Sequence, residues 1–300
     1  MKARVIEILL NKYRVRTDEH KELIVGIRGI VKREKAIKVG DIVSLEETYG
    51  ETLITNIHER KNDFIRPSVA NIDNMYIIVA TKDPILDPLL LDKQIVLAES
   101  KGIKPIIVVN KTDLDEENNI TNYIQEVYGK LGYNVIKSSI KDNKISNMNF
   151  LDDIASGEFC AFSGSSGVGK SSIIRILTDN THEIQVGEIS KKNKKGKHTT
   201  KSVVIYEINK NNKDIYLLDT PGFSSFEIYD IESKELKGHY PEFNANSNDC
   251  NYINCSHIGE SEKECAVKRK VNENVIDEGR YQRYIRIYNE LKEKELKKYK

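Results

Sequence analysis

A glycine-rich loop at residues 164–171, Gly-Ser-Ser-Gly-Val-Gly-Lys-Ser, carries the sharpest chemical signal in this sequence. It matches the pattern G-x-x-x-x-G-K-[ST] and stands between a predicted strand (158–164) and a predicted helix (170–178). Glycines allow a tight turn whose amides point inward, so this phosphate loop and the helix N-terminus can hold a β-phosphate. We expect Lys170 to reach the β- and γ-phosphates and Ser171 to bind Mg²⁺. The alternative is a plain glycine turn, which the agreement of motif and context disfavours.

A second candidate is the guanine loop, Asn-Lys-Thr-Asp at residues 110–113. The Asp113 carboxylate can accept two hydrogen bonds from guanine, whereas adenine presents an acceptor at the matching ring position. Asn110 can bond the other edge of the base, and the stem of Lys111 can lie over the ring. Such a short string more often means a polar loop after a strand. Its place at the carboxyl end of the apolar strand 104–110 favours a ligand site.

Two further short motifs fit the same chemistry. Asp-Thr-Pro-Gly at residues 219–222 follows an apolar strand, so Asp219 is placed to hold Mg²⁺ through water and the Gly222 amide to sense a γ-phosphate. Lys-Ser-Ser at residues 137–139 follows the strand after the guanine loop, where Ser138 and Ser139 can support the base from its other side.

The segment 196–200, Gly-Lys-His-Thr-Thr, lies between the phosphate loop and residues 219–222. Thr199 or Thr200 is expected to complete the coordination of Mg²⁺ in a mobile switch. Residues 190–197, which overlap the start of this segment, carry five lysines and no acid, which indicates a solvated loop or one that contacts the phosphates of a partner.

These loops occur in an unusual order, because the guanine loop precedes the phosphate loop. In an ordinary GTPase the phosphate loop comes first. Opening the fold elsewhere and joining its old termini would preserve every spatial neighbour, and such permutation is physically cheap because domain termini often lie close together.

The surrounding elements divide the chain into three predicted domains. Residues 1–66 contain short strand patterns (3–10, 22–31, 41–47 and 51–58) and no long helical period, which predicts a small all-β barrel or sandwich. Residues 67–230 alternate strands with helices, including a helix at 88–100, and predict a mainly parallel α/β sheet. Residues 231–300 hold a cysteine cluster and a basic helical tail.

The cysteine cluster consists of Cys250, Cys255, His257 and Cys265. Three thiolates and one imidazole form a closed tetrahedral set, as expected for one structural Zn²⁺ with no open catalytic position. Incidental cysteines are the alternative, disfavoured by the spacing. Cys160 stands apart in an apolar strand and is interpreted as core packing.

Composition excludes several classes. The 300 residues are 39% hydrophobic and 31% charged with a net charge of +1, and no apolar run approaches the length of a membrane span. We expect a cytoplasmic protein without a signal peptide or membrane contact.

Tyr281, Tyr284 and Tyr288 share one face of the basic tail helix, where they could either stack on RNA bases or pack against the protein.

Taken together, the guanine loop, the phosphate loop and the segments 196–200 and 219–223 resemble the circularly permuted GTPases of ribosome assembly, and among them the RsgA (YjeQ/YloQ) family. The resemblance covers essentially the whole chain. It implies an OB-fold barrel, a permuted P-loop GTPase domain and a C-terminal zinc domain. It also implies that GTP is hydrolysed to GDP and that the partners are the 30S subunit and its 16S rRNA, with the chain acting as a monomer.

Hydrolysis is expected to need help, because Phe223 stands where many GTPases place a water-orienting glutamine. The resemblance implicates His198 in catalysis; a solvent-exposed loop histidine is the alternative. Two other functions stay open: an RNA-binding scaffold that uses nucleotide only as a structural ligand, and an ATP-using P-loop enzyme whose guanine loop is accidental.

The expected nucleotide-binding residues fall into a base set and a phosphate set. The base set is Asn110, Lys111, Thr112, Asp113, Ser138 and Ser139. The phosphate set is Gly164, Ser165, Ser166, Gly167, Val168, Gly169, Lys170, Ser171, Ser172, Asp219 and Gly222. Lys170, His198, Thr199 and Thr200 are the expected catalytic residues.

Overall fold

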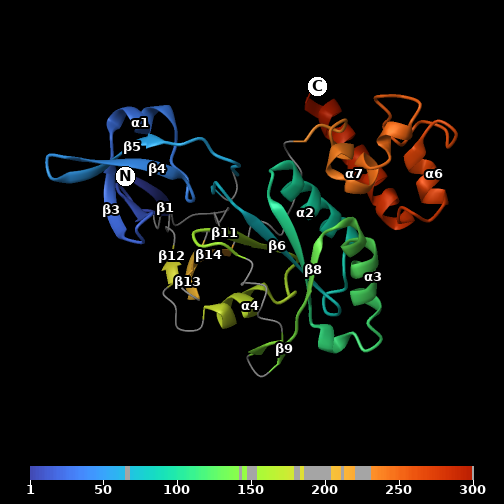
Figure 1. The fold of residues 1–300 in the computed structure, drawn as a ribbon, viewed down its shortest axis with the longest axis horizontal. Helices are drawn as coiled ribbons and strands as arrows, with labels where there is room; N and C mark the ends of the chain where they lie inside the picture. The colour runs from blue at the N-terminus through green and yellow to red at the C-terminus, as the bar shows by residue number, and fades with distance from the viewer. Residues whose placement is uncertain are drawn as a thin grey trace, which may run out of the picture.

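The structure is a computed structural model that describes residues 1–64, 68–141, 144–146, 154–178, 183–185, 204–210, 213–219 and 231–298. In Figure 1 the N-terminal barrel and the C-terminal helices lie at opposite ends of the molecule, with the central sheet between them.

Within residues 1–64, five strands close into a barrel in the order β1-β2-β3-β5-β4. The strands are β1 (Lys2–Ile8), β2 (Tyr13–Thr17), β3 (Glu22–Ile27), β4 (Ile42–Thr48) and β5 (Glu51–Ile57). Val5, Val15, Val43 and Ile54 are fully buried in its core, as alternation along half-buried strands requires. The predicted strand over 22–31 is too long, because β3 ends at Ile27 and a short helix α1 (Gly29–Glu34) follows.

The described part of the central domain contains a seven-stranded sheet in the order β12-β13-β14-β11-β6-β7-β8. The five strands β14, β11, β6, β7 and β8 run parallel, whereas β12 and β13 are antiparallel additions at one edge. Their bounds are β6 (Asn74–Ala80), β7 (Lys104–Asn110), β8 (Asn134–Lys137), β11 (Phe159–Ser163), β12 (Glu183–Gln185), β13 (Val204–Lys210) and β14 (Lys213–Asp219). A small hairpin joins β9 (Ile140–Lys141) to β10 (Lys144–Ile145).

Helices cover both faces of this sheet, and all seven residues of β6 are therefore buried. On one face Ile77 and Val79 pack with α2 (Pro88–Ser100) and α3 (Asn119–Val127). On the other face Tyr76 and Ile78 pack with α4 (Lys170–Leu177). Two short 3₁₀ turns, η1 (Thr112–Leu114) and η2 (Gly129–Leu131), flank α3. This is the mainly parallel α/β layer arrangement that the sequence predicts.

Helix α2 begins as its sequence dictates. The Asp87 side chain accepts hydrogen bonds from the amides of Leu89 and Leu90, and Pro88 occupies the first helical position. Both features are favourable at a helix N-terminus, since Asp87 satisfies two free donors and proline has no donor to lose.

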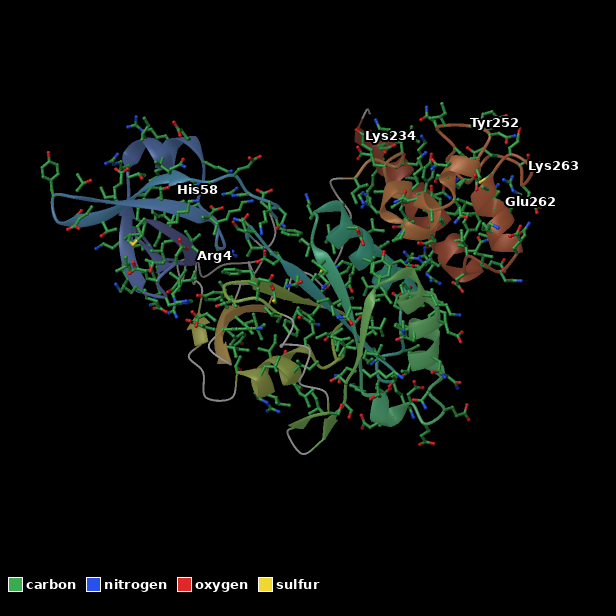
Figure 2. All side chains as sticks on the ribbon, in the orientation of Figure 1. Arg4, His58, Lys234, Tyr252, Glu262 and Lys263 are labelled. Atoms are coloured by element: carbon green, nitrogen blue, oxygen red, sulfur yellow. The ribbon has the colours of Figure 1, made fainter. Side chains whose placement is uncertain are left out.

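The barrel contacts the central sheet near the amino-terminal ends of the sheet strands β11 and β14. Arg4 of β1 lies where the barrel meets the central domain (Figure 2). Its guanidinium carbon is 4.7 Å from the ring centroid of Phe159. Arg16 of β2 pairs with Glu207 at 3.0 Å and with Asp214 at 3.2 Å. The barrel is thereby bound to the hairpin β13–β14 at the end of the sheet opposite to Asp219.

The C-terminal residues form a helical module around an aromatic core. Its elements are η5 (Leu236–His239), α5 (Pro241–Asn244), η6 (Ser247–Asp249), α6 (Ala266–Asn272) and α7 (Glu278–Lys298). Tyr281 and Tyr284 of α7 are buried in this core, with Tyr284 edge-on to Phe243 at 4.7 Å. The tyrosine face of the tail helix is therefore packing, not a stacking surface for RNA.

A buried charge network joins the module to the sheet domain. Arg280 of α7, only 1% exposed, donates to Asp92 of α2 at 2.5 Å and to Glu242 at 2.6 Å. Its guanidinium lies 4.6 Å from the ring centroid of Tyr240 and 5.1 Å from that of Tyr128. Although burial opposes the charge, the two carboxylates raise the pKa of Arg280 well above its usual value.

Replacing Arg280 with alanine is expected to lower the free energy of unfolding by about 3–5 kcal/mol, because it leaves Glu242 buried without its ion-pair partner and removes one partner of Asp92. Denaturation by urea with zinc present measures the change. The matched control is Arg286→Ala on the same helix. That side chain is 69% exposed and lies 3.5 Å from Glu290, so its loss should cost less than about 1 kcal/mol. Equal effects of the two substitutions would contradict this account.

Candidate functional site

The carboxyl ends of five parallel strands lie at the same end of the sheet, because all five run in the same direction: β6, β7, β8, β11 and β14. Loops that follow adjacent parallel strands gather at that end, where α/β proteins bind ligands. The guanine loop follows β7, Ser138 follows β8, the phosphate loop follows β11 and Asp219 ends β14. The topology thus brings together segments separated by about a hundred residues.

The guanine loop is held from two sides. Asn110 is 1% exposed, and its Nδ2 donates to the carbonyl of Val168 in the phosphate loop at 2.8 Å. The Thr112 amide and hydroxyl both donate to the carbonyl of Ser138, at 3.2 and 3.1 Å. Asp113 itself is exposed in the η1 turn. The carboxylate is therefore presented to solvent on a loop whose neighbours are fixed.

Two polar atoms beside this loop are buried without a hydrogen-bond partner among the described residues: Asn110 Oδ1 and Ser138 Oγ. A buried polar atom without a partner costs free energy, about 1–3 kcal/mol. Both belong to the residues predicted to contact the base. Ser139 lies next to them, and its amide donates to Ser146 Oγ at 2.9 Å. This donor and acceptor set fits the polar edge of a nucleobase.

The phosphate loop has the backbone that its glycines predict. Gly164, Gly167 and Gly169 all have positive φ, at 138°, 84° and 102°. A Cβ on Gly164 would lie 2.2 Å from the carbonyl oxygen of Ile78, and one on Gly169 would lie 2.3 Å from Asn110 Nδ2. Larger residues at these two positions would clash with the strand and with the guanine loop.

The Lys170 ammonium folds back over the loop, donating to the carbonyls of Gly164 at 2.6 Å and Ser165 at 2.7 Å. Helix α4 begins at Lys170, so the free amides of its first turn face the same loop. Ser166 and Ser171 are exposed, Ser172 is half-buried and Val168 is buried. The loop therefore has the donors and the positive charge that phosphate oxygens require.

Part of the predicted site lies outside the described residues. His198, Thr199, Thr200, Gly222 and Phe223 all fall there. The backbone of Asp219 is described at the end of β14, paired with Phe162 of β11 and Val204 of β13.

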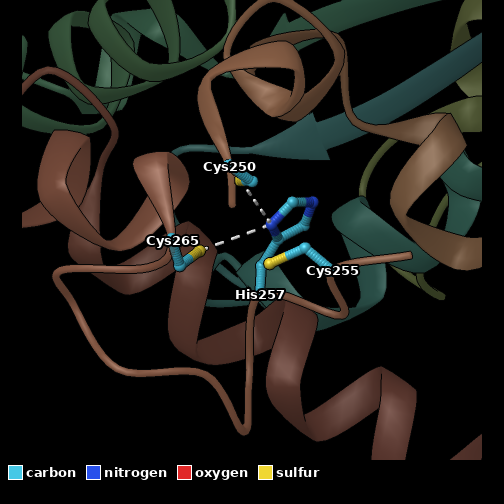
Figure 3. A group of neighbouring side chains, drawn as sticks. All are labelled: Cys250, Cys255, His257 and Cys265. Atoms are coloured by element: carbon cyan, nitrogen blue, oxygen red, sulfur yellow. Dashed lines mark hydrogen bonds between the residues drawn. The ribbon is translucent and has the colours of Figure 1, made fainter. Parts of the chain in front are cut away.

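The cysteine cluster converges in the C-terminal module (Figure 3). The ligand atoms of Cys250, Cys255, His257 and Cys265 all lie within 4.8 Å of one another. His257 Nδ1 is 3.4 Å from Cys265 Sγ and 3.8 Å from Cys250 Sγ. Three sulfurs and one imidazole at this spacing could hold a tetrahedral Zn²⁺.

Burial sets the protonation of these groups. It lowers the pKa of His257 to about 4, so the imidazole is neutral at pH 7 and free to act as a ligand. Burial likewise raises the pKa of the Cys255 and Cys265 thiols, which would keep them protonated without a cation. A divalent cation reverses that preference, because coordination stabilises the thiolate.

Residues outside the ligand set hold the cluster loop in place. The hydroxyls of Tyr281 and Tyr284 donate to the carbonyls of His257 at 2.6 Å and Ser256 at 2.7 Å. Lys237 Nζ donates to the Cys255 carbonyl at 2.9 Å. The sequence did not predict these three hydrogen bonds. The spacing of the tyrosines indicated only that they share one face of α7. The free Cys160 is buried in β11, which confirms the interpretation of core packing.

In the described part of the chain, no helix combines the length and the apolar character that crossing a bilayer would require.

Comparison with known proteins agrees with this geometry. Residues 57–229 match the family model described as RsgA GTPase. A small ribosomal subunit biogenesis GTPase RsgA from Ruminiclostridium cellulolyticum is 38% identical over 272 residues, covering 89% of this chain and 85% of the relative. Another from Oceanobacillus iheyensis, RsgA 2, is 38% identical over 294 residues, covering 96% of this chain and 97% of the relative.

Two solved structures share the fold. The crystal structure of YjeQ from Thermotoga maritima superposes with a TM-score of 0.80 at 30% identity, covering 97% of this chain and 98% of that one. YloQ, described as a circularly permuted GTPase, gives a TM-score of 0.77 at 30% identity, covering 98% of this chain and 95% of that one. The likeness thus extends over barrel, sheet and C-terminal module together.

Proposed function

Because this chain belongs to the RsgA GTPase family, a family of GTP hydrolases, we propose that it binds the small ribosomal subunit and hydrolyses GTP to GDP during maturation of that subunit. One observation supports the proposal that the chain binds a guanine nucleotide. The Asn110 side chain joins the guanine loop to the phosphate loop at 2.8 Å, although the two motifs stand in reversed order along the chain. This hydrogen bond holds the two motifs together as parts of one site.

In this proposal the base lies against Asn110, Lys111, Thr112, Asp113, Ser138 and Ser139. The exposed Asp113 carboxylate accepts from the ring N–H and the exocyclic amine of guanine. The buried Asn110 Oδ1 and Ser138 Oγ support the assignment, since a bound purine and its ordered water would supply the partners they lack.

The phosphates are assigned to residues 164–172, with the Lys170 ammonium leaving its carbonyl partners to meet the β- and γ-oxygens. Mg²⁺ neutralises phosphate charge when bound, and Ser171, Asp219 and one of Thr199 and Thr200 are its proposed holders. The Gly222 amide is proposed to contact the γ-phosphate, and His198 to orient the attacking water.

The 16S rRNA is the proposed surface of contact within the subunit. The N-terminal barrel supports this assignment, since OB-type barrels bind oligonucleotides on their strands and loops. One Zn²⁺ in the cysteine cluster is assigned a structural role. We place the protein in the cytoplasm as a monomer when not bound to its partner.

Turnover of GTP should rise by about tenfold or more when purified small subunits are added, because a partner can supply or position a group that orients the attacking water, a role that Phe223 cannot fill. The effect is measured as phosphate release with small subunits, with large subunits and with neither. The large subunits serve as the control. Nucleotide binding without stimulation would instead favour an RNA-binding scaffold that holds GTP as a structural ligand. Equal affinity for GDP and ADP would remove the guanine assignment.

A further inference from the structure

The segment between β6 and α2, residues 81–87, lies beside both nucleotide motifs and belongs to neither. Strand β6 lies between β11 and β7 in the sheet, and Figure 1 labels β11 and β6 next to each other in the central region. Because the three strands are parallel, the chain that leaves β6 at Ala80 emerges between the phosphate loop and the guanine loop. Topology alone therefore makes this β6–α2 loop a neighbour of the site.

The loop holds the guanine loop through three hydrogen bonds. The Thr81 hydroxyl donates to the carbonyl of Lys111 at 2.5 Å, and the Thr81 amide donates to the carbonyl of Asn110 at 3.1 Å. In return the Lys111 ammonium donates to the carbonyl of Asp83. Lys111 is thus bound at both its backbone and its side-chain end.

The Lys111 backbone needs such support, because its φ of 59° lies in the left-handed region. A residue with a Cβ enters that region at a cost, and it persists where the surroundings hold it. The bond from Thr81 acts on the peptide that links Lys111 to Thr112. Asp113 follows one residue later, so the orientation of this peptide sets where its carboxylate lies.

The β6–α2 loop is itself anchored at both ends. At its start Thr81 continues the buried strand β6, and at its end Asp87 caps α2 through the amides of Leu89 and Leu90. Its middle, Pro84 to Leu86, shares a pocket with Gly164, Ser165 and Val168 of the phosphate loop. A loop fixed in this way can transfer its rigidity to the guanine loop.

We propose that Thr81 is a positioning residue for guanine recognition. Its hydroxyl fixes the Lys111 peptide, so that Asp113 meets both the ring N–H and the exocyclic amine of a guanine nucleotide. The Asp83 carbonyl anchors the Lys111 ammonium, so that the lysine stem spans the face of the base. This inference deepens the proposed function and rests on its nucleotide site.

The test compares Thr81→Val, Thr81→Ser and wild type for affinity toward GDP and toward inosine diphosphate, which lacks the exocyclic amine. Thr81→Val should weaken GDP binding roughly two- to tenfold, the effect of one hydrogen bond. It should also narrow the ratio of GDP to inosine diphosphate affinity, since a displaced Asp113 gains less from the amine. Thr81→Ser keeps the hydroxyl and should restore both values.

Thr55→Val is the matched control, because that half-buried hydroxyl also donates to a backbone carbonyl, Ser44 at 3.4 Å, but lies in the barrel. It should leave both affinities unchanged. An unchanged GDP to inosine diphosphate ratio in Thr81→Val would overturn the inference, even if its melting temperature falls, since the role would then be structural alone. Failure of the wild type to bind GDP would instead sink the proposed function.

Discussion

Substitution of Asp113 by asparagine is expected to weaken GDP binding roughly 10²- to 10⁴-fold, since one hydrogen bond to the charged acceptor is lost and the other becomes a weaker, neutral one. The new amide group would place a donor against the exocyclic amine of guanine. Xanthine carries a carbonyl at that position, so the variant should prefer xanthosine diphosphate. Titration of both nucleotides against variant and wild type measures the reversal.

The control for this substitution is Glu116→Gln, which removes a charge from an exposed position three residues further on. Loss of charge alone would act on both variants in the same direction, whereas loss of specific contacts acts only through Asp113. A variant Asp113→Asn that kept its preference for GDP over xanthosine diphosphate would show that the base lies elsewhere. The C-terminal module should be unaffected, because Asp113 is remote from its core in sequence and in contacts.

Removal of zinc should produce the second large effect. Structural zinc contributes about 10–16 kcal/mol to the folding of small metal-bound modules. We therefore expect Cys255→Ser, or a strong chelator, to unfold residues 231–298 while the sheet domain still binds GDP. Metal analysis should find one zinc per chain in the wild type, and limited proteolysis should cut the variant within the C-terminal module.

Cys160→Ala provides the comparison, since this buried cysteine lies in β11 and outside the cluster. Its zinc content should equal that of the wild type even if its stability falls. A wild-type chain that holds no zinc and melts unchanged in chelator would remove the metal from the account. The hydrophobic packing of Tyr240, Phe243 and Tyr284 would then have to suffice for the module.

Much of the fold could be predicted where local signals agree. The bounds predicted for the helix at 88–100 and the strand at 104–110 match α2 and β7, because Pro88 marks the helix start and residues 105–109 are an unbroken apolar run. The barrel strand β2 lies outside the predicted strands, although the alternation of arginines with Tyr13, Val15 and Thr17 is the pattern of a half-buried strand. The first residues of helix α1 fall within the strand predicted over 22–31, because Ile30 and Val31 favour β-structure.

The site could be predicted as a set of motifs but not as a set of contacts. Spacing located Asn110, Asp113 and Lys170, since each belongs to a pattern with a fixed chemical role. It could not locate Thr81 or Arg280. The bond from Arg280 to Asp92 joins residues 188 positions apart, and nothing in either local sequence marks the partner. Such pairs depend on how helices and strands pack against one another, and the hydrophobic periodicity of a single segment does not predict that packing.

The reversed order of the motifs also governs when the sheet closes during synthesis. Strands β6, β7 and β8 and their helices are contiguous from Asn74 to Lys137 and can assemble as soon as they leave the ribosome. The other edge of β6 must wait for β11, which begins at Phe159. At about 5–20 residues per second, residues 81–158 take on the order of ten seconds to synthesise. For that time β6, whose seven residues are all buried in the finished sheet, presents an unpaired edge in the nascent chain, which is a hazard for aggregation.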